Sequence, residues 1–293
     1  MNPEDQIILV DKPAGISSFG VVAKVRGFLK AKYGHKVKVG HTGTLDPFAT
    51  GLLILLSGKM TKHSSEFLKK DKVYEAVLKL GFTSTTGDPE GEIVKYQSEI
   101  HMHLKEGSED SLDGQARYCS VEDTLATTGA NGATGPRNDN ATKREKAELA
   151  RLSERGSGVC QELDGREGAR PKRNDIELVT SKFIGNISQT PPRFSAIKIG
   201  GERAYKLARK GADFEMPTRE VEIYSIDILD YHYPYLTIRC HVSSGTYIRT
   251  LAEDIGEKLG TGAYLTSLRR LKIADYDISG AHPLSDFTTF DRE

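Results

Sequence analysis

Asp46 stands out among the acidic residues because of the segment around it, which reads VGHTGTLDPFATGLL over 39–53. Three glycines within a dozen residues permit tight turns with positive φ, and Pro47 restricts the backbone on both of its sides. This context predicts a carboxylate that is held rigidly. The same Asp-Pro pair is also typical of an ordinary turn or helix cap, and residue types alone favour that simpler interpretation.

The glycines of this segment could also form a phosphate-binding loop. However, the segment lacks the Gly-Lys-Ser/Thr ending of a P-loop and the spacing of a dinucleotide fingerprint, which disfavours a nucleotide hydrolase. The three cysteines, Cys119, Cys160 and Cys240, lie far apart and share no CxxC or His/Cys spacing. Neither a disulfide framework nor a zinc site is therefore expected, and the thiols are interpreted as inert.

The overall composition excludes several classes of protein. A chain of 293 residues with 37% hydrophobic content can bury the core of one large or two ordinary domains. Lys plus Arg equals Asp plus Glu at 41 each, so any nucleic-acid role must depend on a local basic patch. The longest apolar run, 52–56, is too short to span a bilayer, and the acidic N-terminus does not resemble a leader. These features predict a soluble cytoplasmic protein.

The composition changes sharply near residue 97 and changes back near residue 175. Between these points the residues are small, polar and charged, and Tyr118 is the only aromatic. A segment of this kind buries too little apolar surface to offset its ordering entropy. The sequence therefore predicts a long, low-complexity, mostly disordered insertion at 98–174, with a short solvated helix at 142–154.

The elements outside the insertion indicate an α+β fold. A strand is expected at 6–10 and a turn at 11–15, followed by a helix that Ser17 or Ser18 caps and whose apolar residues recur at helical spacing through Leu29. Further strands are expected at 73–80, 92–96, 220–229 and 235–242, and a further helix at 248–259, before Gly260. This order favours a mixed, mostly antiparallel sheet flanked by helices over a regular βαβ repeat.

Nine short blocks of the chain carry a recognisable pattern. The central block is GHTGTLDPFATG at 40–51. The other blocks are DKPAGISS at 11–18, GKMTK at 58–62, VYEA at 73–76, LGFTSTTGDPEG at 80–91, QTPPRFSAIK at 189–198, AYKLAR at 204–209, SGTYIRTL at 244–251 and LRR at 268–270. In this order the blocks resemble those of the bacterial tRNA pseudouridine-55 synthases, the TruB family, and the central block is similar to the catalytic motif of that family. Together they extend over nearly everything except the insertion.

The resemblance implies a pseudouridine synthase fold formed by 1–97 and 175–293, with a thumb-like RNA-binding segment at 189–219. It also implies the reaction, in which uridine 55 of the tRNA T-loop is isomerised to pseudouridine. The flipped base leaves the ribose, turns, and is rejoined through carbon. The resemblance implies no metal and no other cofactor for this reaction.

The resemblance assigns catalysis to three residues. Asp46 is the catalytic carboxylate, and both a covalent mechanism and a glycal intermediate stay open. Arg249 pairs with Asp46 and keeps it ionised in the closed pocket, where burial opposes ionisation. Tyr74 stacks on the target base and handles the proton at the ring carbon. From residue types alone, Arg249 would be a surface arginine and Tyr74 a core tyrosine.

The resemblance also implies a set of substrate-binding residues. His41 helps to hold the loop whose base is flipped, Tyr247 lines the pocket, and Lys62 and Asp88 match positions near the site or the RNA. The 189–219 segment is locally basic with interleaved aromatics, which predicts shape-based RNA binding with phosphate contacts. Its expected RNA-binding side chains are Arg193, Lys198 and Arg209. The simpler interpretations are a locally bonded histidine, an Asp-Pro turn, a solvated lysine and a charge-rich helix.

Two features depart from the family pattern. The insertion shortens a helical connection to about 175–183, and the chain ends soon after the LRR block, where longer members continue into a PUA RNA-binding domain, so no PUA domain is expected. The expected partner is tRNA, with no membrane contact, and the expected state is a monomer. Two other functions stay open: a non-catalytic tRNA-binding or RNA-folding protein on the same scaffold, and a pseudouridine synthase acting on another RNA, such as the guide-directed relatives.

Overall fold

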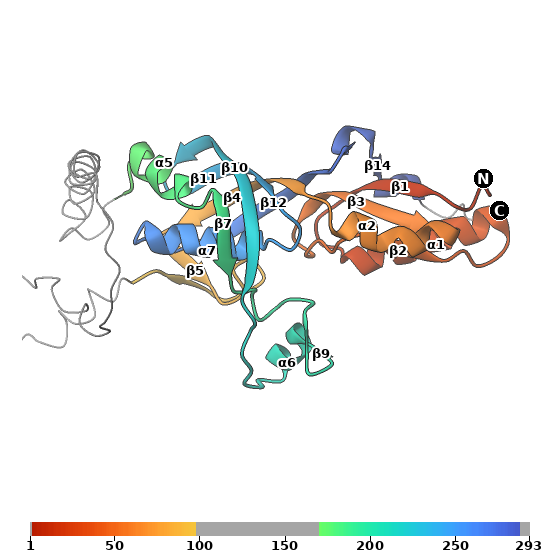
Figure 1. Ribbon diagram of the computed structural model, residues 1–293, viewed down its shortest axis with the longest axis horizontal. Helices are drawn as coiled ribbons and strands as arrows, with labels where there is room; N and C mark the ends of the chain where they lie inside the picture. The colour runs from red at the N-terminus through yellow and green to blue at the C-terminus, as the bar shows by residue number, and fades with distance from the viewer. Residues whose placement is uncertain (1, 98–169, 288–293) are drawn as a thin grey trace, which may run out of the picture. The chain divides into compact units, whose positions relative to one another are not determined.

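The computed structural model describes residues 2–97 and 170–287 of the chain. Residues 98–169 of the predicted insertion, including the helix predicted at 142–154, lie outside the described residues. The stretches on either side of this gap fold together into one compact unit (Figure 1). None of the described helices is both long and apolar enough to cross a membrane.

A mixed sheet of ten strands organises the described part of the chain. Its main path runs in the order β14-β1-β3-β12-β4-β11-β10-β7, while β2 pairs with β3 and β13 pairs with β12. The strands are β1 (Ile7–Lys12), β2 (Val39–His41), β3 (Thr50–Ser57), β4 (Lys72–Leu80), β7 (Gly185–Gln189), β10 (Arg219–His232), β11 (Tyr235–Val242), β12 (Ala263–Ile273), β13 (Tyr276–Asp277) and β14 (His282–Pro283). Only the β1/β14 and β12/β3 pairs are parallel, which confirms the expected mostly antiparallel sheet.

Helices and two short hairpins accompany this sheet. The hairpins are β5 (Phe82–Ser84) with β6 (Ile93–Lys95), and β8 (Lys198–Ile199) with β9 (Glu202–Arg203). The α-helices are α1 (Ser18–Tyr33), α2 (Ser64–Leu68), α5 (Arg173–Ser181), α6 (Ala204–Arg209) and α7 (Ile248–Lys258), and the 3-10 helices are η1 (Gly58–His63), η2 (Ile278–Gly280) and η3 (Leu284–Phe287). Residues 190–218, named here the excursion, connect β7 to β10 and carry β8, β9 and α6 away from the sheet (Figure 1).

Helix α1 begins and ends as its sequence indicates. The Ser17 side chain caps it by accepting a 3.1 Å hydrogen bond from the Gly20 N–H, and Gly34 ends it in the left-handed conformation with φ of 77°. Ser17 is thus the cap and Ser18 the first helical residue. The buried valines and Leu29 of α1 pack on β1, β2 and β3.

Strand β3 follows the Asp46 loop and is buried on both faces. Its apolar run 52–56 has 0% exposure throughout. Leu53 and Leu55 pack against the α1 side, while Leu52, Ile54 and Leu56 pack with Phe67 and Ile273 in a separate cluster. Burial on both faces explains why this strand is continuously apolar and lacks the alternation that marks a half-exposed strand.

Helix α7 packs on the other end of the sheet. Ile248, Leu251, Ala252 and Ile255 join the buried cluster that β4, β10 and β11 also form, which confirms the helical face expected from their spacing. Cys240 of β11 lies in the same cluster, and burial raises the pKa of its thiol to about 12. This thiol is therefore inert, as expected.

Candidate active site

The loop between β2 and β3 carries Asp46, and hydrogen bonds fix its backbone on both sides. Before Asp46, the Ser18 hydroxyl accepts from the Leu45 N–H at 2.8 Å and donates to the Leu45 carbonyl at 2.9 Å. After it, the Pro47 carbonyl accepts from the Gly15 N–H at 2.9 Å. The carboxylate is therefore mounted on a constrained backbone, as the Gly-rich and Pro-containing context predicts.

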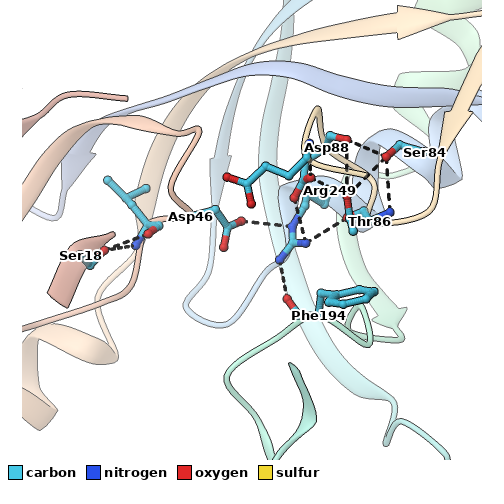
Figure 2. Close-up of polar contacts among 9 residues, drawn as sticks. Ser18, Asp46, Ser84, Thr86, Asp88, Phe194 and Arg249 are labelled. Atoms are coloured by element: carbon cyan, nitrogen blue, oxygen red, sulfur yellow. Dashed lines mark hydrogen bonds and ion pairs between the residues drawn. The ribbon is translucent and has the colours of Figure 1, made fainter. Parts of the chain in front are cut away.

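The Arg249 guanidinium joins this loop to two other segments (Figure 2). Its Nε lies 3.1 Å from an oxygen of Asp46, and one Nη lies 3.2 Å from an oxygen of Asp88. The same Nη donates to the Thr86 carbonyl at 3.0 Å, and the other donates to the Phe194 carbonyl of the excursion at 3.0 Å. Each guanidinium nitrogen thus has a partner, and Arg249 is only 4% exposed. We name Asp46, Arg249 and Asp88 the Asp46 cluster.

Asp88 is oriented by the turn between β5 and β6. Its second carboxylate oxygen accepts from the Thr86 hydroxyl at 2.5 Å and from the Glu90 N–H at 3.0 Å, and the Ser84 hydroxyl donates to its carbonyl at 2.6 Å. Gly87 has a φ of 72°, a left-handed conformation that favours glycine. This turn places Asp88 beside Arg249.

Burial and charge act against each other at Asp46. Burial raises the pKa of this carboxyl above its usual value, and the nearby Asp88 raises it further. The cations Arg249, Lys12 and Arg270 oppose this shift, but the net direction is upward. The cation expected beside Asp46 is present, yet it only partly offsets the effect of burial.

Two further acids surround Arg249. Burial raises the pKa of Glu253 to about 7, and Arg249 opposes that shift. Burial, followed by the charges of Asp88 and Asp46, also raises the pKa of Glu90. The site therefore contains more carboxyl groups than one guanidinium can neutralise, and their raised pKa values favour the protonated forms unless additional positive charge lies nearby.

Lys12 and Arg270 supply that additional positive charge, and neither was singled out from the sequence. Lys12 is fully buried and donates to the carbonyls of Pro13 and Pro47 at 2.8 and 3.1 Å, and burial lowers its pKa to about 8. Arg270 is 1% exposed, and it donates to the Leu52 carbonyl at 2.7 Å and to the Gly43 carbonyl at 3.1 Å. Both lie within recognised blocks, but the sequence placed Lys12 in a turn and predicted no strand around Arg270, so local patterns did not identify them.

Comparison with known proteins identifies the family of this chain. The family model described as TruB family pseudouridylate synthase (N terminal domain) matches residues 28–118 and 146–248, and the model described as tRNA pseudouridylate synthase B C-terminal domain matches 249–292. The chain belongs to the TruB family. The described part of the second match includes β12, which pairs with β3 and β4 inside the sheet.

Curated relatives of this TruB family member carry the name tRNA pseudouridine synthase B. The protein of Cupriavidus pinatubonensis is 36% identical over 94% of this chain and 64% of its own length. The protein of Chloroherpeton thalassium is 35% identical over 97% of this chain and 89% of its own length, and that of Neisseria meningitidis serogroup A is 35% identical over 99% and 70%. The chain thus spans less than two thirds of the first relative and most of the second.

Solved structures share the fold at lower identity. A Cbf5-Nop10-Gar1 complex matches with a TM-score of 0.57 and 22% identity, over 97% of this chain and 53% of the other. An H/ACA RNP bound to a substrate RNA matches with a TM-score of 0.53 and 20% identity, over 98% and 58%. These likenesses support the pseudouridine synthase fold.

Tyr74 and His41 lie on separate strands of the TruB fold, β4 and β2. Tyr74 is a buried residue of β4 in the same cluster as Leu45 and Ala49, which flank Asp46, and its hydroxyl makes no hydrogen bond with any described residue. His41 ends β2, and its Nδ1 accepts a long 3.4 Å bond from the Gly43 N–H. Burial and the charges of nearby arginines lower the pKa of His41, so the neutral ring is favoured.

Tyr247 is fixed at the start of α7 by a residue that sequence reasoning missed. The Gln189 side chain accepts from the Tyr247 N–H at 2.8 Å and donates to its carbonyl at 3.0 Å. Gln189 is 1% exposed, so this amide forms a buried clamp between β7 and the N-terminus of α7. The Tyr247 ring lies 5.7 Å from the Arg219 guanidinium.

The four remaining predicted residues lie apart from the Asp46 cluster. Lys62 is exposed on η1, and Arg193, Lys198 and Arg209 are exposed on the excursion. Arg193 lies over the Phe214 ring at 4.6 Å, and Arg209 over Tyr205 at 5.8 Å. Among the described residues, these four side chains make no hydrogen bond or ion pair with the cluster. Nor do 2–97 and 170–287 contain a group of acidic, histidine or cysteine side chains able to hold a metal ion.

Proposed function

We propose that this chain isomerises uridine to pseudouridine in tRNA, at uridine 55 of the T-loop. One observation carries the proposal: a buried guanidinium, from Arg249, binds the Asp46 carboxylate inside the block GHTGTLDPFATG. Membership of the TruB family supports the same activity, because relatives at 34 to 36% identity are named tRNA pseudouridine synthase B.

The reaction rearranges bonds within one nucleoside. The bond from ribose C1′ to uracil N1 breaks, the base turns, C1′ bonds to C5, and the proton on C5 moves away while N1 gains one. Asp46 assists this exchange as an ionised carboxylate, either by attacking the nucleoside or by taking a sugar proton. Because burial raises the pKa of Asp46, Arg249 is needed to keep enough of the carboxyl ionised at neutral pH.

Tyr74 is the proposed partner of Asp46 on the base. Its buried ring offers a stacking surface, and its hydroxyl has no hydrogen bond to a described residue, so the phenol is available to the substrate. We assign it the proton of C5. His41 and Tyr247 then border the flipped nucleoside from β2 and from the start of α7.

The excursion is the proposed RNA-binding surface. Arg193, Lys198 and Arg209 are exposed and lie among aromatic rings, which suits contacts to phosphates and unstacked bases of a folded loop. Lys62 adds a further exposed cation on η1. The Asp46 cluster is complete within one chain, so we propose that the enzyme acts as a monomer, in the cytoplasm where tRNA is found.

The decisive experiment uses an unmodified tRNA transcript and maps pseudouridine after incubation with the wild type or with Asp46→Asn. We expect modification at position 55 by the wild type and a loss of at least about 1,000-fold in the variant, since removal of a group that acts on the reacting atoms has effects of that order. A transcript with cytidine at position 55 is the matched substrate control. If both the wild type and Asp46→Asn bind the tRNA without modifying it, the result would instead support a non-catalytic RNA-binding protein. If the wild type modifies only another RNA, the result would support a pseudouridine synthase with a different RNA substrate.

A further inference from the structure

The Ser18 hydroxyl makes an unusual pair of contacts one residue before Asp46 (Figure 2). A single oxygen accepts from the Leu45 N–H at 2.8 Å and donates to the Leu45 carbonyl at 2.9 Å. Both residues are buried, Ser18 at 2% and Leu45 at 4% exposure. One side-chain atom thus satisfies both polar groups of one backbone residue.

The Ser18 hydroxyl bonds the backbone groups of Leu45 in the way that a neighbouring strand would. In an antiparallel pair, two residues exchange both of their backbone hydrogen bonds, and here the hydroxyl does the same for Leu45. Because Leu45 lies outside β2 and β3, no strand is paired with it. Without the hydroxyl, a buried N–H and a buried carbonyl would both lose their partner, which is strongly unfavourable.

The bonded carbonyl belongs to the peptide unit that enters Asp46. Rotation of this unit would swing the Cα–Cβ direction of Asp46, and so the carboxylate, relative to Arg249. On the far side, the Pro47 carbonyl is held separately by the Gly15 N–H and by Lys12. Ser18 is therefore the sole side chain among the described residues that hydrogen-bonds the backbone of Leu45.

We propose that Ser18 is a positioning residue whose hydroxyl, by bonding both backbone groups of Leu45, holds the Asp46 carboxylate against Arg249. The positioning itself is a property of the free protein. Its effect on turnover rests on the function proposed above, so the two consequences are measured separately.

Ser17 provides a matched control for Ser18. It is the neighbouring serine and its hydroxyl also bonds a backbone N–H, that of Gly20, at 3.1 Å. Ser17→Ala removes a helix cap and lowers the melting temperature, but it leaves Leu45 untouched. Ser18→Cys is the second variant, because it keeps nearly the same shape as serine while its thiol is a poor hydrogen-bond donor.

The first measurement is hydrogen exchange of the Arg249 Nε–H in the free protein, followed by NMR. In the wild type the Arg249 Nε forms an ion pair with Asp46 at an N–O distance of 3.1 Å, and we expect its proton to exchange slowly. We expect faster exchange in Ser18→Ala and Ser18→Cys, approaching Asp46→Asn, with Ser17→Ala unchanged. Exchange in Ser18→Ala equal to that of the wild type would overturn the proposal, whether or not the protein is an enzyme.

The second measurement is turnover on the tRNA transcript. A displacement of about 1 Å costs on the order of 100-fold in rate, so we expect kcat to fall about 10- to 100-fold in Ser18→Ala with KM within about twofold. Ser18→Cys should resemble Ser18→Ala, and Ser17→Ala should keep the wild-type kcat.

If Ser18→Cys keeps full kcat, packing alone explains the site and the proposal is wrong. If the wild type itself is inactive, the proposed function fails and the exchange experiment decides on Ser18.

Discussion

The Asp46 cluster and the excursion both use arginine, but in opposite settings. Arg249 is buried, and each of its guanidinium nitrogens is committed to a carboxylate or a carbonyl. Arg193 and Arg209 are exposed and contact aromatic rings of their own segment. A buried charge with fixed partners positions and tunes other groups, whereas an exposed charge acts over a longer range and is weakened by salt. The two regions should therefore differ in which kinetic constant they control.

The buried side of this comparison is tested most strongly by Tyr74→Phe. The ring and its packing remain, so stability and tRNA affinity should stay within about twofold of the wild type. Loss of the phenol should lower kcat by roughly 100-fold or more, the usual contribution of a positioned acid or base. Single-turnover kinetics measures this effect. An unchanged kcat in Tyr74→Phe would show that Tyr74 only packs in the core and takes no part in the reaction.

Arg249→Lys should have the next largest effect. Lysine keeps the charge but cannot reach Asp46, Asp88 and the Phe194 carbonyl together, because it lacks the planar fork. We expect kcat to fall by about 100-fold, with a much smaller change in KM. Arg173→Lys, on the exposed face of α5, is the matched control and should leave both constants unchanged.

The pH profile of the same variant sharpens the assignment. In the proposed role Asp46 acts as a carboxylate, so we expect activity above its folded-state pKa and loss of activity as the pH falls through that value. Burial raises this pKa in the wild type and Arg249 opposes the rise. A weaker contact from lysine should therefore move the acid limb of kcat to higher pH. An unchanged or lower acid limb would contradict the role given to Arg249.

Substitutions in the excursion should have the smallest effect on activity. They should act through KM, whereas substitutions in the Asp46 cluster act through kcat. In the double variant Arg193→Ala with Arg209→Ala, we expect kcat/KM to fall about 10-fold through KM while kcat is retained. If each arginine contacts a phosphate, the slope of log affinity against log salt should become shallower by roughly one to two. Binding titrations at several salt concentrations measure this slope. A loss of kcat at saturating tRNA would contradict the proposal that the excursion and the Asp46 cluster control different kinetic constants.

The spacing of apolar residues correctly predicted the strands and helices that have one buried and one more exposed face. Strand β11 occupies the expected residues, and α7 begins where its apolar spacing begins. Strand β3 was not identified, since burial on both faces removes the alternation. Strand β12 was also missed, because two irregularities interrupt its pairing with β4, at Leu265/Ser267 and Arg270/Lys272.

The site was predictable only where the family pattern carried information. The pairing of Arg249 with Asp46 was expected from the resemblance, although helical periodicity alone placed Arg249 off the apolar face. The contacts of Ser18, Lys12 and Arg270 were not foreseen, because each joins segments far apart in the sequence through a backbone carbonyl. A carbonyl acceptor leaves no trace in residue types, so such contacts require the folded chain.

The burial of β3 on both faces has a consequence for how the protein loses activity. The loop of Asp46 runs directly into a strand that has no exposed residue from 52 to 56 and that pairs with β1, β2 and β12. Such a strand cannot detach without dismantling two hydrophobic clusters, so it belongs to the last structure to melt. Heat inactivation of the site should therefore coincide with global unfolding, and amide protons of β3 should be among the slowest to exchange.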